Sequence, residues 1–566
     1  MATTRRRSVF GGVVVLLLVA GALVPLGIGL TKTFTPSGPS DSAGSAVAPL
    51  EPAPSQSTTT PATKPGPSSQ PVAKQAAQGP VGDLHVVRDV RVDNLPVRAN
   101  GRCADAFEPI VATHPTDPNR IAVAYQRFVP AGDGRCHLDP VIAISHDRGR
   151  TWRIAPGRPW LGSDRFPDHH SAIAWGPGPR KGSARLYWAD AMAAPDGGHL
   201  LGIASSDTEG RSWSHMYIER RTPPWVGGFP DITVDRNPRS PDRGVVYAAY
   251  NWLADRERGP GLRVLASSDF GRTWHPIEIP AAPGPPGFGA AWRIAYRIRT
   301  APDGAAYVSW YQVDLHVWDS QHVFAKGGFA NVGRLGFAVA PIRYHRATGT
   351  FTRGPGSEAF SEPRNAYTVS DLPAPGTTNN VYVAPGWCQG FDVDPRNGRV
   401  YLAVGVYGPR SRPDAARGQV RVGRSDDNGR HWAWTTVPAL PRVQGRPQSA
   451  FRPSLVATGG KVFVAFHGIT DVPPGTSPDR AIPTIGTSFS VSFDGGRTFS
   501  TPRSASRVRW NAASLEPALT GPGLRDRGEA LADGSIVYAY GDGRLADPPP
   551  DPSAGRSSVF AAIVAL

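Results

Sequence analysis

The architecture can be read from Ser145-His146-Asp147-Arg148-Gly149-Arg150-Thr151-Trp152, because the chain repeats this motif. Close copies begin at Ser267, Ser425 and Ser492, and a fifth, beginning at Ser205, has one extra residue before its glycine. In the shared pattern Ser-x-Asp-x-Gly-x-Thr-Trp, the Asp and Ser/Thr oxygens can accept hydrogen bonds from turn amides, the Gly permits a positive φ, and the aromatic ring returns to apolar packing. The repeat therefore predicts hairpin turns in which the Asp is structural.

A second repeat sets the number of units. Each copy joins an aromatic or apolar residue to a polar one, usually near a proline, and an alternating apolar strand follows. The polar members are Glu108, Asp168, Asp231, Arg293, Gln389, Arg452 and Glu516, spaced 60, 63, 62, 96, 63 and 64 residues apart. Such self-similarity is typical of propeller blades. We predict an all-β propeller of four-stranded antiparallel blades over residues 83–566, with seven blades favoured and six as the alternative.

The last unit is about one strand shorter than the others. Residues 84–93 alternate like a strand and have no other partner in the pattern. Ring closure removes free sheet edges. We therefore expect this N-terminal strand to complete the last blade.

The first 82 residues differ in character from the rest. Three arginines at 5–7 precede an apolar run over residues 9–30, which is long enough to cross about 30 Å of hydrocarbon. We predict a cytoplasmic basic N-terminus (1–8), a transmembrane signal-anchor (9–30) and a disordered Pro/Ser/Thr/Ala-rich spacer (31–82). The propeller would then lie outside the cell membrane. The alternative is a secreted protein whose signal is cleaved near Ala46-Val47-Ala48.

Composition excludes several classes of protein. With 64 Gly and 59 Pro in 566 residues the chain is unlike a helical bundle, and 3 Cys exclude a disulfide-dense scaffold. The net charge of +15 becomes +11 beyond the spacer, because that part keeps 55 of 61 Lys and Arg and 44 of 46 Asp and Glu. Basic and aromatic residues do not interleave, so we expect no nucleic acid, and a glycan or anionic cell-envelope polymer as partner. The alternative is an arginine-rich composition with no polyanionic partner.

The five turns resemble the Asp-box (BNR) repeat of sialidase-like β-propellers, and the likeness covers roughly residues 84–566. In a four-stranded up-and-down blade these turns lie at one end of the ring and the first strand begins at the other, here called the mouth, where we expect the ligand site. The resemblance also implies six blades, so a seventh would depart from the family. A sialidase clamps the substrate carboxylate with three arginines, uses a Tyr activated by Glu as nucleophile, and uses an Asp as acid and base.

This resemblance suggests roles for individual residues. Arg293 and Arg452 would belong to the clamp, with Arg102 as its third member, and Tyr382 or Tyr367 would be the nucleophile. Either Asp168 or Asp231 would be the acid. The family's Arg-Ile-Pro signature is absent. Phe451-Arg452-Pro453 looks like it with one residue missing, and such a loss would turn the arginine to the opposite side of the strand.

Other mouth residues have two readings each. Glu108 and Glu516 could form a carboxylate pair for ordinary glycoside hydrolysis, or could satisfy backbone amides around the channel. Unit four carries two long insertions at the mouth, and their aromatic and polar residues suit a sugar platform or are ordinary surface loops. The expected ligand contacts are Arg102, His169, His170, Trp318, His322, Trp387 and Gln389.

Cysteines and histidines at the mouth complete the predictions. Cys103 and Cys136 map to the mouth in an oxidising compartment, so we expect a disulfide between them. Adjacent histidines point apart on a strand, so we predict no metal site, and we predict no cofactor.

Two functions from different classes follow. The absent signature and the anchored topology favour a non-catalytic module that binds a glycan or a protein at the cell envelope. The alternative is an exo-glycosidase of sialidase type that acts on a terminal acidic sugar, a reading kept open by the basic ectodomain and the mouth arginines.

Overall fold

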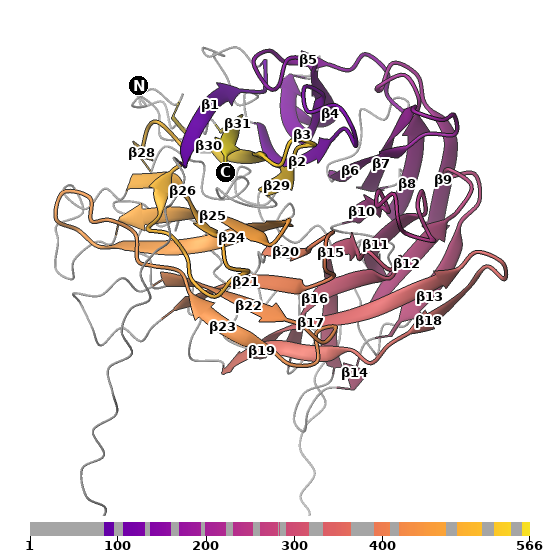
Figure 1. The fold of residues 1–566 in the computed structure, drawn as a ribbon. Coiled ribbons are helices and arrows are strands. Elements are labelled where there is room, and N and C mark those ends of the chain that lie inside the picture. The colour runs from indigo at the N-terminus through magenta and orange to yellow at the C-terminus, as the bar shows by residue number, and fades with distance from the viewer. Residues whose placement is uncertain are drawn as a thin grey trace, which may run out of the picture. The chain divides into compact units, whose positions relative to one another are not determined.

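Seven antiparallel sheets surround a common axis in the computed structural model (Figure 1). The structure describes residues 84–94, 106–130, 136–159, 169–193, 199–221, 230–252, 261–280, 282–283, 290–315, 332–363, 390–407, 418–470, 484–511, 526–544 and 557–566. The predicted anchor and spacer lie outside these ranges. Among the described residues, no helix is long and apolar enough to cross a membrane. The propeller and the preference for seven blades are confirmed.

Each of the first three blades contains four strands in sequential order. Blade 1 consists of β2 (Ala106–Thr113), β3 (Ile121–Pro130), β4 (Cys136–Ser145) and β5 (Arg153–Ile154). Blade 2 consists of β6 (His169–Pro177), β7 (Ala184–Ala193), β8 (His199–Ser206) and β9 (Ser214–Arg221). Blade 3 consists of β10 (Asp231–Val234), β11 (Val246–Trp252), β12 (Gly261–Ser267) and β13 (His275–Ile279).

Blades 4 to 6 follow the same order, and two of them gain strands. Blade 4 consists of β14 (Ala282–Pro283), β15 (Ala290–Thr300), β16 (Ala306–Leu315), β17 (Val332–His345), β18 (Thr350–Arg353) and β19 (Ser357–Pro363). Blade 5 consists of β20 (Gly390–Val393), β21 (Val400–Tyr407), β22 (Gly418–Ser425) and β23 (Ala433–Thr436). Blade 6 consists of β24 (Gln448–Thr458), β25 (Lys461–Thr470), β26 (Thr484–Ser492), β27 (Arg503–Ser504) and β28 (Trp510–Asn511).

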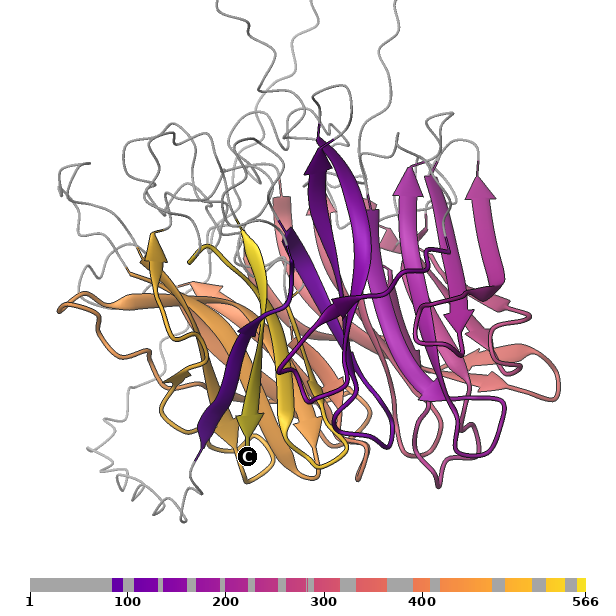
Figure 2. The same cartoon turned by 90° about the horizontal axis from the view of Figure 1, so that it is seen from above.

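The last blade joins both ends of the propeller. It consists of β29 (Arg527–Ala530), β30 (Ile536–Asp542), β31 (Ser558–Ala565) and, as its outer strand, β1 (His85–Arg91). β1 pairs antiparallel with β31, so that His85 lies opposite Ala565 and Arg91 opposite Phe560. Closure by the N-terminal strand is therefore confirmed. Figure 2 shows β1 and β31 side by side.

The position predicted for the seventh inner strand was wrong. The spacing placed its start at Glu516, but β29 begins eleven residues later, at Arg527. Glu516 itself lies outside the described residues. The turn after β29, Asp533-Gly534-Ser535, has the same form as Asp303-Gly304-Ala305 after β15. This Asp-Gly turn therefore locates the inner strand better than the motif at Glu516 does.

The repeated turns behave as the sequence predicts. In the first, Ser145 Oγ accepts from the amide of Gly149 (2.8 Å), and Asp147 accepts from the amides of Arg150 (3.0 Å) and Thr151 (2.9 Å). Gly149 has φ 74°. These hydrogen bonds hold the pKa of Asp147 down at about 2, although burial alone would raise it. The turns all connect the third and fourth strands of a blade, at the end opposite the mouth, here called the box face.

The fifth copy has a different register from the one predicted. Ser206 Oγ, not that of Ser205, accepts from the amide of Gly210 (2.8 Å). Thr208 Oγ1 takes the place of the Asp oxygen and accepts from the amide of Ser212 (2.9 Å). No residue is inserted. The neighbouring Asp207 is therefore free of the turn and pairs with Arg185 of β7.

Tyrosines of two second strands, β16 and β21, tie neighbouring blades together. Tyr307 donates to Asn428 Oδ1 of the next box turn (2.7 Å), and Tyr401 donates to the carbonyl of Gly495 (3.4 Å). The apolar cores between blades surround these rings, as at Tyr187 and Tyr247. The blades are thus locked at the box face.

Candidate functional site

Only part of the predicted site lies within the described structure. Glu108, His170, Asp231 and Arg452 are described with their side chains. Arg293, His169 and Cys136 are described by their backbones alone, in β15, β6 and β4. The remaining predicted positions lie outside the described residues: Asp168, Tyr382, Tyr367, Glu516, Arg102, Trp318, His322, Trp387, Gln389 and Cys103. The predicted disulfide and the roles of all these residues stay predictions.

Glu108 and His170 meet at the mouth between blades 1 and 2. Glu108 Oε2 lies 3.0 Å from His170 Nδ1 and accepts from Gln126 Nε2 at 3.0 Å. All three side chains are buried. The carboxylate fixes which way the imidazole faces, so that the pair can hold or transfer a proton as one unit. Both roles predicted for Glu108 stay predictions.

Arg452 is brought inward by a β-bulge that the sequence did not reveal. The pairing of β24 with β25 shifts between Phe451 and Ser454, and Arg452 has φ 50°. Glu108 sits on a matching bulge, with φ 52° and a following proline. A bulge re-aims a side chain, and a left-handed non-glycine residue costs about 1–3 kcal/mol, which the surroundings must offset. The missing residue therefore does not turn Arg452 outward, because the bulge compensates for it.

Asp231 is engaged in ion pairs that cross the axis. It begins β10 and is fully buried. Oδ1 pairs with Arg527 of blade 7, and Oδ2 accepts from Arg299 Nη1 (3.1 Å) and from the Ile298 amide (2.9 Å) of blade 4. Burial alone would raise its pKa, but Arg527, Arg299 and Arg297 outweigh burial and lower it. These ion pairs and hydrogen bonds stabilise the ionised carboxylate, and the acid role of Asp231 stays a prediction.

Asp526 organises a second group of charges beside Arg527. Its Oδ2 lies 2.6 Å from His467 Nε2, its Oδ1 accepts from the Gly541 amide (3.1 Å), and its carbonyl accepts from Arg297 Nη2 (3.4 Å). Burial raises the pKa of Asp526, and the hydrogen bond to His467 and the charge of Arg452 oppose that rise. Arg297, Arg452 and Arg527, from blades 4, 6 and 7, thus converge on one short segment.

Sequence reasoning missed Arg297 and Arg527. Each lies seven residues before the glycine of the turn that follows its strand, Gly304 and Gly534. Both lie at the level of Asp231, because each of the three pairs with the fourth residue of its second strand, Ser309, Ala539 and Ala249. Alignment on aromatic residues pointed to Arg293 instead, because β15 extends to Ala290 beyond its siblings.

Arg527 retains unused hydrogen-bonding capacity. Nε and Nη1 of Arg527 are buried and have no hydrogen-bond partner within the described structure. Burial and the nearby charge of Arg297 lower the pKa of Arg527 to about 9. Buried donors without acceptors are costly, and guanidinium groups bind carboxylates in a bidentate manner. The geometry is therefore suited to receiving an anionic group.

Below this cluster, polar contacts join blades 1, 3 and 7 around the axis. Arg236 pairs with Glu529 (3.6 Å) and donates to the Thr113 carbonyl (2.8 Å), and Glu529 accepts from the Thr113 amide (3.1 Å). A cavity of about 120 Å³ is left at the box-face end, between Arg299, Asp392 and Glu529. Burial raises the pKa of Asp392 to about 6, against the opposing charge of Arg299.

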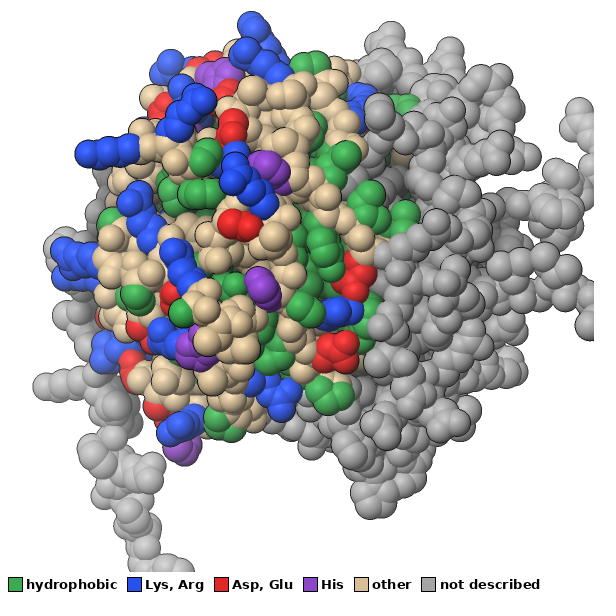
Figure 3. Space-filling model, turned by 90° about the vertical axis from the view of Figure 1, so that its right-hand side faces the viewer, with side chains coloured by type: hydrophobic (Ala, Val, Ile, Leu, Met, Phe, Trp, Pro, Cys, Tyr) green, Lys and Arg blue, Asp and Glu red, His purple; other side chains and the backbone are tan. Residues whose placement is uncertain are grey.

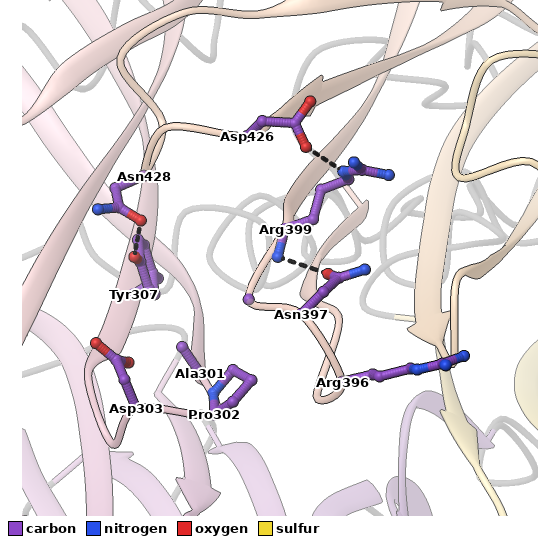
Figure 4. Close-up of a pocket in the computed structure, with 10 residues that line it drawn as sticks. Ala301, Pro302, Asp303, Tyr307, Arg396, Asn397, Arg399, Asp426 and Asn428 are labelled. Carbon is purple, nitrogen blue, oxygen red and sulfur yellow. Dashed lines mark hydrogen bonds and ion pairs between the residues drawn. The ribbon is translucent and has the colours of Figure 1, made fainter.

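A separate cleft of about 330 Å³ lies between blades 4 and 5 at the box face (Figure 4). Pro302 and Tyr307 line one side, and the turn Arg396-Asn397-Gly398-Arg399 lines the other. Asp426 pairs with Arg399 at its edge. Within the described ranges, no three His, Cys, Asp or Glu side chains gather as metal ligands would.

Comparison with known proteins finds distant structural neighbours. No family model and no curated protein matches the sequence. An α-L-arabinofuranosidase from Fusarium graminearum aligns at 10% identity over 84% of this chain and 97% of its own, with a TM-score of 0.37. A Hadza microbial sialidase aligns at 15% identity over 82% and 67%, with a TM-score of 0.32. Trypanosoma rangeli sialidase aligns at 13% over 57% and 45%, with a TM-score of 0.29. Structural neighbours thus include arabinofuranosidases and sialidases, at a distance that assigns no activity.

Proposed function

We propose that this propeller binds a carboxylate-bearing sugar of an envelope glycan at its mouth. The observation that carries the proposal is the convergence of Arg297, Arg452 and Arg527 beside Asp526, with two buried donors of Arg527 unpaired within the described structure. A carboxylate could accept from these donors and offset the crowding of like charges. The sugar that bears the carboxylate would also present hydroxyl groups, which polar side chains at the mouth can bind.

The proposal includes the topology predicted from the sequence. An apolar run long enough to span a bilayer, at residues 9–30, would anchor the chain and leave the propeller outside. In this arrangement the protein is a tethered binding module for its glycan. Flotation of the full chain with neutral vesicles in high salt would support the anchor. Failure to float would favour the secreted alternative.

Binding is tested by thermal unfolding of the full chain with a panel of sugars in acidic and neutral form. Uronic and sialic acids should raise the unfolding temperature, and the matching neutral sugars should not. Arg527→Lys should abolish the rise, because lysine keeps the charge but cannot form a bidentate pair. If Arg527→Lys unfolds by itself, Arg297→Gln makes the same test. A rise that is equal for acidic and neutral sugars would exclude the carboxylate as the recognised group.

The second candidate is hydrolysis of the bound sugar, favoured specifically by the Glu108–His170 pair. These buried groups could hold and deliver a proton at the same mouth. A panel of fluorogenic glycosides, with sialoside and uronide included, would detect turnover. Hydrolysis that disappears in Glu108→Gln and in Arg293→Ala would establish an enzyme. Carboxylate-dependent binding without turnover would leave the binding module.

A further inference from the structure

Positively charged side chains gather on the box face, at the opposite end of the ring from the mouth. In each of the five repeated turns an exposed arginine follows the turn glycine directly, namely Arg150, Arg211, Arg272, Arg430 and Arg497. The turns between first and second strands emerge at the same end, since Asn119 of one accepts from the Arg148 amide of a box turn (3.0 Å). Figure 3 shows the ring from its side, with Lys and Arg projecting along the left edge.

These cations are not neutralised by the acids around them. The box aspartates are hydrogen-bonded to amides of their own turns, as Asp269 is in accepting from the amides of Arg272 (3.0 Å) and Thr273 (2.9 Å). Other acids of this face are engaged by different arginines, for example Asp533 by Arg148 (2.6 Å). Arg211 and Arg272 form no ion pair within the described structure, nor do Arg150, Arg430, Arg180, Lys181, Arg239 and Arg396.

The described chain also begins and ends on this face. His85, the first residue of β1, lies opposite Ala565, and Arg88 Nη1 donates to the Arg148 carbonyl of the first box turn (2.8 Å). Leu566 accepts from Lys461 Nζ beside the turn that precedes β25 (3.4 Å). Residue 84, the first described residue of the propeller, therefore lies at the box face, at the end away from the mouth.

We propose that the box face docks on a surface of anionic phospholipid headgroups. The cations form a rigid array on the turns of several blades, and such an array matches many small anionic groups spread over a plane. The mouth would then face away from the membrane toward the glycan. This inference does not depend on what the mouth binds, and it draws on the proposed N-terminal anchor only for the side at which the chain approaches.

A fixed array of exposed cations predicts the strength and salt dependence of docking. Each Lys or Arg near an anionic bilayer contributes about 1 kcal/mol, or about fivefold in the docking constant. The attraction should disappear when salt shortens the Debye length from about 10 Å to about 3–4 Å. Loss of two arginines should weaken docking by about 25-fold.

The test uses the full chain, with a fluorophore attached at its C-terminus on the box face, reconstituted into vesicles that carry an acceptor lipid. Energy transfer should be stronger with phosphatidylserine than with phosphatidylcholine alone, and high salt should remove the difference. Arg211→Gln with Arg272→Gln should reduce the transfer. The matched control, Arg442→Gln with Arg507→Gln, removes two exposed arginines outside the box face and should leave it unchanged.

Two results would overturn the inference. In the first, energy transfer is equal in neutral and anionic vesicles, and the chain stays bound to both kinds of vesicle in high salt. This result would show that the propeller is anchored but does not dock. Binding of a soluble polyuronate that depends on Arg211 and Arg272, without any effect of phosphatidylserine, would replace the lipid surface by an anionic polymer. A chain that leaves neutral vesicles would contradict the anchor separately.

Discussion

Closure of the ring by β1 should depend on the buried carboxylate of Asp89. Its oxygens accept from Tyr540 Oη (2.6 Å), Arg544 Nη1 (2.5 Å) and the Arg507 amide (3.1 Å), which joins the first strand to blades 6 and 7. Asp89→Asn keeps the size of the side chain and removes its charge. Arg544 would retain Asp542 at 2.7 Å.

The cost follows from these contacts. Removing one partner of a buried pair costs about 3–5 kcal/mol, and the remaining pair to Asp542 places this case near 3 kcal/mol. At about 2.1 cal/mol/K per residue, an unfolding unit of roughly 480 residues loses about 1 °C for each kcal/mol, so the midpoint should fall by about 3 °C.

Thermal unfolding of the full chain, followed by circular dichroism, makes the measurement. Asp117→Asn is the matched control, because Asp117 pairs with Arg120 at 3.1 Å on the surface, with its side chain 35% exposed. That change should cost less than about 1 kcal/mol. If Asp89→Asn is as mild as the control, the buried cluster does not hold the ring closed.

Two further changes test the turns and the axis. Asp269→Ala removes the acceptor of the Arg272 and Thr273 amides, and should destabilise the protein by about 2 kcal/mol in thermal or denaturant unfolding; an unchanged midpoint would deny the Asp its structural role. Asp392, with an ordinary pKa of 3.8, titrates near 6 in the folded protein, so it stabilises the fold most below its unfolded pKa and loses that contribution as the pH rises through 6. Asp392→Asn should therefore make the unfolding temperature less dependent on pH between about 4 and 7, and an identical pH profile would contradict the assignment.

The repeats predicted most of the fold because each blade solves the same local problem. Turn chemistry at Asp147 and Gly149 is set within eight residues, so it can be read from the sequence without knowing the neighbours. The position of a strand in its sheet, by contrast, is not set by a short local motif. The seventh inner strand was misplaced because Leu515-Glu516-Pro517 has the form of Phe107-Glu108-Pro109, while the strand itself starts at Arg527.

The site was predicted less completely, for physical reasons that particular residues show. Arg452 was found from its motif, but its inward direction depends on a bulge with a left-handed residue, which the letters Phe-Arg-Pro do not specify. Arg297 and Arg527 were missed because nothing in their local sequence shows that they meet. Their convergence comes from ring geometry, which brings blades 4 and 7 together near the axis.

Recognition of a carboxylate by the mouth arginines can be measured in a single titration. The full chain would be titrated calorimetrically with an acidic sugar from the panel and with the methyl ester of the same sugar, which differs only in the negative charge. We predict that the ester binds at least about tenfold more weakly, since charge-assisted hydrogen bonds to guanidinium are worth about 1.5–3 kcal/mol. Equal affinity for acid and ester would show that the mouth arginines do not recognise the carboxylate.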